Sequence, residues 1–295
     1  MTEIQNLPRA LQFMVAASAL VAVTTLLAKY LGTPTGGDLV IHPFQQSAGR
    51  YVFAFFAILC VVVAVSFTPK TRLKLTPIHW RLHILRSTLG GLGVTCIFAA
   101  ASRMPLADAT AISFLNPIVT MALAAIMLGE SVGIKKWVAA GLALTGAMII
   151  LRPGTSAFQM AGLLALAAAF LTGFEAIIVK KLSRVEGTLQ ILLVNNAIAS
   201  IGVLFIAMWF WVAPSAAQWG ALIALGFVMV TAQAFFLSSM RRADASFVMP
   251  VFYSVLVFVV IYDFALFGAW PSIFAVLGSG FIFLGAMLLL KTGKQ

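Results

Sequence analysis

Long apolar runs separated by short polar segments make up almost the whole chain. Each run is about twenty residues long, the length of α-helix that crosses the hydrocarbon core of a bilayer. On this criterion we predict ten helices, at residues 11–31, 45–67, 82–101, 105–128, 134–151, 158–180, 189–212, 218–239, 245–266 and 270–290. The predicted fold class is therefore an all-α integral membrane protein with ten transmembrane helices, joined by short connections.

Two stretches of the chain occur twice. GLALTGAMIILRPG at 141–154 and GFIFLGAMLLLKTG at 280–293 are identical at six of fourteen positions. GGLGVTCIFAAASRMPLADA at 90–109 and GFVMVTAQAFFLSSMRRADA at 226–245 are identical at eight of twenty. Shared helix composition does not explain why ADAT and ADAS stand in register with the upstream Gly and Val-Thr. The chain is therefore predicted to contain two homologous halves of five helices each.

The odd number of helices in each half sets their relative orientation. After five crossings the second half starts on the opposite side of the membrane, so the two repeats are inverted. Inverted repeats are typical of secondary transporters, in which one half rocks against the other around a central site. The repeated glycine pairs, Gly141 with Gly146 and Gly280 with Gly285, predict close helix packing rather than a pathway lining.

The composition agrees with a membrane protein. Of 295 residues, 62% are hydrophobic and 9% charged, whereas soluble domains have about 25% charged residues. The net charge of +11 comes from short basic clusters between apolar runs rather than from one patch, which argues against nucleic-acid binding. With a cytoplasmic N-terminus, 15 of the 19 basic residues fall on the inner side. We therefore expect a multi-pass protein of a bacterial-type inner membrane with both termini cytoplasmic.

The predicted arrangement of ten helices in two halves of five, together with one segment of the first half, resembles a known family. PLADATAISFLNPIVTMALAAIMLGESVGIKKWVAAGLALTGAMIILRPG at 105–154, together with the arginine in SAGRYVFAFF, resembles the EamA family of the drug/metabolite transporter superfamily. The resemblance covers essentially the whole chain and implies one EamA-type five-helix repeat at 1–154 and a second at 155–295. It also implies a carrier of small metabolites such as amino acids, S-adenosylmethionine or riboflavin. In the second half LGE is replaced by FGA at 267–269 and Pro117 has no counterpart in register, so symmetric roles do not follow.

Ionisable residues inside the predicted helices are candidates for a site, because each costs about 2.5–3.5 kcal/mol to insert. Glu175 is the deepest acidic residue; it would relay a proton or bind an amine, or else pair with Lys180 or Lys181. Arg50, on the outer side, would attract an anionic group, close an outer gate, or extend to the lipid headgroups. Arg86 would either anchor the topology at the inner side or act as a substrate or gate residue.

Neutral polar residues and prolines give further candidates. Pro117 and Pro250 interrupt the helical hydrogen bonding, and interrupted helices in both halves point to a transporter site, although a tolerated kink is the alternative. The amide side chains either face a cavity or link helices; they are Asn116, Asn195, Asn196 and Gln233. The aromatic side chains would stack on a flat ring or serve packing; they are Phe235, Phe236, Tyr253 and Tyr262.

Together these features predict a secondary transporter of a small organic metabolite rather than an enzyme. The aromatic residues favour uptake of a riboflavin-like nutrient; export of amino acids, or carriage of an S-adenosylmethionine-type metabolite, is the alternative. A membrane enzyme would need clustered His, Asp or Ser at a membrane face, and a scaffold or sensor would not need inverted halves. His79 and His83 lie in a predicted basic loop, where we expect no metal site, and no cofactor motif is present. Protons as coupling ions and a homodimer in the lipid bilayer are left open.

Overall fold

The computed structural model describes residues 6–33, 39–66, 76–101, 103, 106–152, 154, 160–268 and 270–292. These residues form helices and connections, with no strand among them. The elements are α1 (Leu7–Gly32), α2 (Pro43–Ser66), α3 (Trp80–Ala101), α4 (Leu106–Ser113), α5 (Asn116–Leu128), α6 (Ile134–Leu151), α7 (Met160–Val185), α8 (Thr188–Ala207), the 3₁₀ segment η2 (Met208–Phe210), α9 (Ala216–Arg242), α10 (Ala245–Val248), the 3₁₀ segment η3 (Met249–Tyr253), α11 (Ser254–Phe267) and α12 (Ile273–Thr292).

Helix is present in each of the ten predicted ranges, with ends that differ by a few residues. Eight helical segments of the described chain are long and apolar enough to cross a membrane. α3 is not among the eight, and Ile273–Leu289 in α12 is a shorter apolar helix. The chain is thus a multi-pass, all-helical membrane protein.

The outside of the helix bundle is apolar. Ile126, Ile201 and Phe283 are 80%, 74% and 65% exposed, and many other large apolar side chains are exposed with them. In water such a continuous apolar surface would drive association, whereas the hydrocarbon of a bilayer matches it. Many of the fully buried positions hold alanine instead, which lets the helices approach one another closely.

The predicted helix 105–128 is two helices in the structure. α4 ends at Ser113 and α5 begins at Asn116, and between them the N–H of Leu115 donates to the carbonyl of Ile112 at 3.0 Å. Pro117 lies in the first turn of α5, where its missing N–H has no intrahelical acceptor to lose. The proline therefore starts a new helix rather than bending a continuous one.

The predicted helix 245–266 is also interrupted. A single turn, α10, changes to the 3₁₀ segment η3 at Met249, and Pro250 stands at the start of η3 before α11 resumes at Ser254. A 3₁₀ stretch within a helix is often a hinge. The two interruptions meet, because the hydroxyl of Tyr253 donates to the carbonyl oxygen of Phe114 at 2.6 Å.

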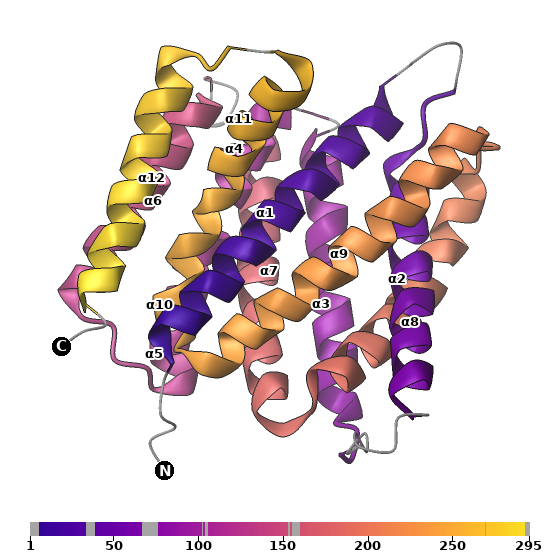
Figure 1. Ribbon diagram of the computed structural model, residues 1–295, viewed down its shortest axis with the longest axis horizontal. Helices are drawn as coiled ribbons and strands as arrows, with labels where there is room; N and C mark the ends of the chain where they lie inside the picture. Colours follow the sequence, from indigo (N-terminus) through magenta and orange to yellow (C-terminus); the bar gives the residue numbers. More distant parts are fainter. Residues whose placement is uncertain are drawn as a thin grey trace.

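Helices of the two halves pack against each other in a reciprocal pattern (Figure 1). α1 packs on α9, and α3 packs on α7. α5 contacts α7 as α11 contacts α1, while α2 pairs with α8 and α6 pairs with α12. Exchanging the first to fifth helices of one half for those of the other leaves this set of pairs unchanged. α1 begins and α12 ends at the same end of the bundle.

The close pairing of α6 with α12 depends on glycine. A Cβ on Gly278 would lie 2.5 Å from the carbonyl oxygen of Gly146, and one on Gly285 would lie 2.7 Å from that of Ala139. Gly141 and Gly280, the other members of the repeated pairs, have no atom of another described helix within 4 Å of the position that a Cβ would take. Only one glycine of each predicted pair therefore serves helix contact.

We expect Gly278→Ala to destabilise the protein by about 1–3 kcal/mol, because the added methyl group collides with the backbone of α6. Gly280→Ala is the matched control, since it gives the same gain in helix propensity with open space around the new methyl group. Thermal unfolding midpoints of the two variants in detergent measure the difference. Equal midpoints would contradict the role of Gly278 in helix packing.

Candidate functional site

A cavity of ≈ 250 Å³ lies among α1, α2, α3, α5, α7, α9 and η3. Six of the residues singled out from the sequence line it, namely Arg50, Arg86, Asn116, Glu175, Gln233 and Phe236. No residue of α6 or α12 is among its lining residues. The cavity therefore lies between the two halves, and the α6–α12 pair stands apart from it.

A charge pair joins the halves at this cavity. The Nε of Arg86 on α3 lies 3.5 Å from the Oε1 of Glu175 on α7. Arg86 is 3% exposed, so it is a buried cation rather than a topology anchor at the membrane surface. A Cβ on Gly90 would lie 3.0 Å from Oε2 of Glu175, so this glycine leaves room for the carboxylate.

The ion pair that the described residues show for Glu175 is with Arg86, and Lys180 has other partners. Lys180 is buried and donates from Nζ to the carbonyl oxygens of Met240 and Ala243, at the end of α9. The predicted alternative pairing of Glu175 with Lys180 or Lys181 is therefore replaced by the pairing with Arg86. The ion pair of Glu175 joins two helices instead of lying within one helix.

Arg50 contributes a second cation to the cavity. Its guanidinium carbon lies 4.3 Å above the ring of Tyr51, which is a cation–π distance. Both residues line the cavity, and the Nε of Arg50 is buried with no hydrogen-bond partner in the segments that the structure describes. The side chain therefore faces the interior instead of extending to the lipid headgroups.

Two amide side chains bring hydrogen-bonding groups to the same space. The Nδ2 of Asn116 donates to the hydroxyl oxygen of Thr172 at 3.4 Å, and its Oδ1 has no hydrogen-bond partner in the described part of the chain. The Oε1 of Gln233 is likewise buried without a partner. Buried polar atoms normally have at least one hydrogen-bond partner. These two oxygens are exceptions among the described residues, and they are available to accept hydrogen bonds from a ligand.

The remaining candidates do not line the cavity. Asn195 and Asn196 are buried on α8, where Asn196 donates to the carbonyl of Leu192 in its own helix. Tyr253 is fully buried and occupied with Phe114. Pro117 and Pro250 also lie outside the lining, although their neighbours Asn116 and Met249 belong to it.

The aromatic candidates are similarly divided. Phe236 lines the cavity together with Phe252, and their rings meet edge to face with centroids 6.1 Å apart. Phe235 packs on Phe13 instead, and Tyr262 packs on Phe258. Of the four aromatic residues that suggested a flat ring, Phe236 alone lines the cavity, and Phe252 completes the aromatic wall.

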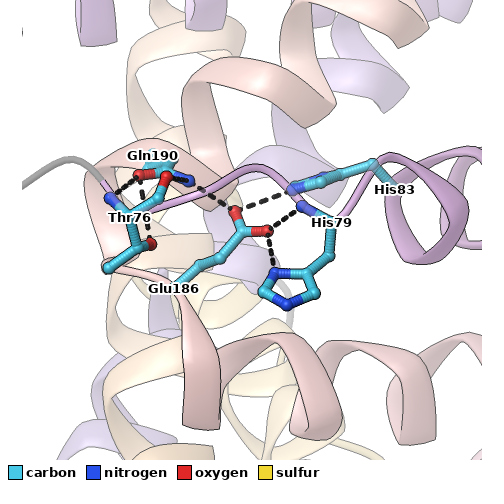
Figure 2. Close-up of polar contacts among 5 residues, drawn as sticks. All are labelled: Thr76, His79, His83, Glu186 and Gln190. Carbon is cyan, nitrogen blue, oxygen red and sulfur yellow. Dashed lines mark hydrogen bonds and ion pairs between the residues drawn. The ribbon is translucent and has the colours of Figure 1, made fainter.

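A second polar cluster lies away from the cavity, where the start of α3 meets the connection between α7 and α8 (Figure 2). Glu186 is 1% exposed, and its Oε1 accepts from the backbone N–H of His79 at 2.8 Å and lies 3.1 Å from Nδ1 of the same residue. Its Oε2 lies 2.9 Å from Nε2 of His83 and accepts from Gln190 at 3.0 Å. Gln190 also exchanges two hydrogen bonds with the backbone of Thr76.

The position of His83 differs from the basic loop that the sequence suggested. This histidine is a buried residue of α3 rather than part of a basic loop. No group of three metal-ligating side chains is found in the described part of the chain. The cluster ties the first half to the second through a buried carboxylate.

A third carboxylate makes a comparable link. Glu130, which follows α5, is buried and accepts from the backbone N–H groups of Ala245 and Ser246 at 2.9 and 2.8 Å. It thereby binds the start of α10 in the other half, where free N–H groups and the helix dipole favour an anion. Glu130 stands in the LGE motif, whose counterpart in the second half has no acid.

Comparison with known proteins identifies the family to which this architecture belongs. The sequence profile of the EamA-like transporter family matches residues 8–152 and again residues 159–291. The chain belongs to this family. The resemblance to EamA transporters of the drug/metabolite transporter superfamily is confirmed.

EamA-like relatives of this chain carry transport names. The S-adenosylmethionine uptake transporter of Rickettsia prowazekii is 27% identical over 274 residues, which are 93% of this chain and 90% of the relative. The riboflavin transporter of Rhizobium johnstonii is 30% identical over 281 residues, 94% of this chain and 85% of the relative. The pseudopaline exporter of Pseudomonas aeruginosa is 25% identical over 214 residues, 72% and 75% of the two chains.

A solved crystal structure shares the fold. It superposes with a TM-score of 0.74 at 20% sequence identity, over 95% of each chain. The family match and the named relatives support transport of a small metabolite as the activity of this chain, and the solved structure supports its fold.

The Glu186 cluster predicts a pH-dependent stability. Burial by itself raises the pKa of the Glu186 carboxyl, but hydrogen bonds from the His79 backbone and from both imidazole rings outweigh burial, and the pKa lies below the ordinary value. A carboxyl whose pKa is lower in the folded state stabilises the fold above its unfolded pKa, about 4.3. This contribution is lost as the pH falls through the folded pKa.

We therefore expect Glu186→Gln to be less stable than the wild type at neutral pH, by about 1–3 kcal/mol. The difference should shrink as the pH falls from about 4.3, where the carboxyl of the unfolded chain takes up its proton, through the lower pKa of the folded protein. Thermal unfolding midpoints of both proteins in detergent, over a pH series, provide the measurement. A difference that does not change with pH would contradict the assignment of a charged Glu186.

Proposed function

We propose that this protein moves a small organic metabolite across the inner membrane by alternating access, with the Arg86–Glu175 cavity as its substrate site. The observation that carries the proposal is the position of that pair. One partner comes from each half, and both line a cavity between the halves. Motion of one half against the other would therefore change the site directly, as in other carriers built from repeats.

The topology proposed is ten crossings in two inverted repeats, at 1–154 and 155–295, with both termini cytoplasmic. The sequence repeat, the reciprocal helix pairs and the two matches to one family profile support this division. The distribution of basic residues supports the orientation. A homodimer stays a prediction.

Contacts that join the halves lie at both ends of the bundle. At the proposed cytoplasmic end these are the Glu186 and Glu130 clusters. At the other end Gln45 and Val212 exchange two hydrogen bonds, and Gln218 donates to the carbonyl of Leu39 at 2.8 Å. In an alternating-access cycle one of these sets opens while the other holds.

We propose that the direction of transport is uptake and that the substrate is a nutrient with a planar ring. The uptake transporter of Rickettsia prowazekii supports the direction. Phe236 and Phe252 supply an apolar wall against which a ring would lie. Export is the second candidate, favoured by the similarity to the pseudopaline exporter.

Proteoliposomes that contain the purified protein test transport itself. Labelled riboflavin and labelled S-adenosylmethionine are offered outside vesicles preloaded with the same unlabelled compound, and counterflow is measured. Exchange above that of empty vesicles supports a carrier, since neither an enzyme nor a scaffold exchanges solute. A rescue screen of nutrient auxotrophs then separates uptake from export, because only uptake restores growth.

The topology is tested by single cysteines in a variant without Cys60 and Cys96. Cysteines at Ala213 and Gly268, both on connections at the proposed outer side, should react with an impermeant thiol reagent in intact cells. Cysteines at Ser131 and Arg184, which are exposed at the proposed inner side, should react only after the cells are opened. Labelling of Arg184→Cys in intact cells would contradict the inverted-repeat scheme.

Glu175→Gln tests whether this carboxylate carries a coupling proton. A potential of about 100 mV contributes about 2.3 kcal/mol per charge, enough for roughly fifty-fold accumulation. If Glu175 carries the proton, the variant should lose accumulation against a gradient and keep substrate exchange. If Glu175 binds a cationic group, both should fall together.

Asp263→Asn is the matched control, because this acid lies 3.5 Å from Lys29 and is not among the cavity-lining residues. Uptake against a gradient and counterflow are measured for both variants from mildly acidic to mildly alkaline pH. Wild-type accumulation by Glu175→Gln over that whole range would exclude both roles.

A further inference from the structure

The cavity carries an unbalanced charge. Its charged lining residues in the described part of the chain are Arg50, Arg86 and Glu175. Two guanidinium groups therefore face one carboxylate, and one positive charge is left over. A buried charge without a partner is costly in an apolar medium, so an anionic ligand would be favoured there.

The guanidinium groups have free donors. Arg86 is 3% exposed, and its Nη1 is buried without a hydrogen-bond partner among the described residues. The Nε of Arg50 is in the same state. A guanidinium presents its N–H groups in a planar fork that fits the two oxygens of a carboxylate.

The amide groups restrict the ligand further. The hydroxyl of Thr172 donates to the carbonyl of Ala168 at 2.8 Å, so it accepts from Nδ2 of Asn116, and the other end of that amide is an acceptor. The Oε1 of Gln233 is a second free acceptor. An inorganic anion such as chloride supplies no N–H or O–H group to these oxygens, whereas an organic acid with amino or hydroxyl groups does.

We propose that the cavity recognises its substrate by a carboxylate group, which Arg86 and Arg50 bind, while N–H or O–H groups of the same molecule meet Asn116 and Gln233. This inference rests on the proposed transport function and names the chemical class of its substrate. The apolar remainder of the substrate lies against Phe236 and Phe252. A neutral ring compound without an acidic group leaves the excess positive charge unmatched.

A comparison of compounds tests the class on the wild-type protein. Proteoliposomes are incubated with a metabolite extract of bacteria, and the compounds that accumulate beyond the level in empty vesicles are identified by mass spectrometry. Each is then compared with its analogue that lacks the carboxylate, for example S-adenosylmethionine with its decarboxylated form. We expect the accumulated compounds to bear a carboxylate and the analogues to compete at least about tenfold more weakly, the effect of one charge-assisted hydrogen bond.

Two variants test the residues. Arg86→Lys and Arg50→Lys keep the charge but lose the planar fork, so each should weaken competition by the carboxylate compound about tenfold or more and narrow the gap to its decarboxylated analogue. Arg184→Lys, an exposed arginine outside the cavity, is the matched control. Thermal unfolding midpoints without ligand show that the variants are folded.

The outcomes separate this inference from the transport proposal. Accumulation of riboflavin or other compounds without a carboxylate, at equal or higher levels, overturns the carboxylate site and leaves the transporter in place. Folded Arg86→Lys and Arg50→Lys proteins that discriminate like the wild type overturn the assignment of these residues. If nothing accumulates from the extract and no counterflow occurs, the transport proposal falls and this inference falls with it.

Discussion

The ion pair of Arg86 and Glu175 is the interaction on which the central part of the molecule depends. Each charge alone would be expensive within a membrane protein, and removal of either would leave the other unpaired. The pair crosses from α3 to α7, so it can form only where these helices approach closely. Gly93 allows this approach, because a Cβ there would lie 2.9 Å from the methyl group of Thr172. Thr172 in turn holds Asn116 at the cavity.

Local sequence patterns were sufficient to predict the helices and the charged candidate residues. They were not sufficient to predict which residues pair with those charges. Apolar runs predicted helix in every range, since a bilayer allows few other structures. Glu175, Arg86 and Arg50 stood out because ionisable groups in such runs need a reason. The partner of Glu175 could not be read from spacing, because Lys180 is near in sequence whereas Arg86 is 89 positions away. Pairing between halves is a property of the fold.

The residues that sequence reasoning missed lie at helix ends. Glu186 and Glu130 stand beside lysines and arginines, and there an acid normally indicates a solvated loop. In the structure each is buried because it accepts backbone N–H groups at or near the start of a helix of the other half. The one signal in the sequence was asymmetry, since the acid of LGE is absent from the second half. Asn196 shows the reverse case, because the side chain of a polar residue in an apolar helix can donate to a carbonyl of that same helix.

A carboxylate on Arg86 would compete with Glu175 for the same guanidinium group. Once displaced, Glu175 would be a carboxylate without its partner in an apolar environment, and a proton would neutralise it. The cavity with bound carboxylate and bound proton would then have the same net charge as the empty cavity, because the two added charges cancel. Equal charge in both states matters for a carrier, since each must pass through the same low-dielectric interior when the halves move. Binding of a carboxylate at Arg86 would thus be coupled to protonation of Glu175.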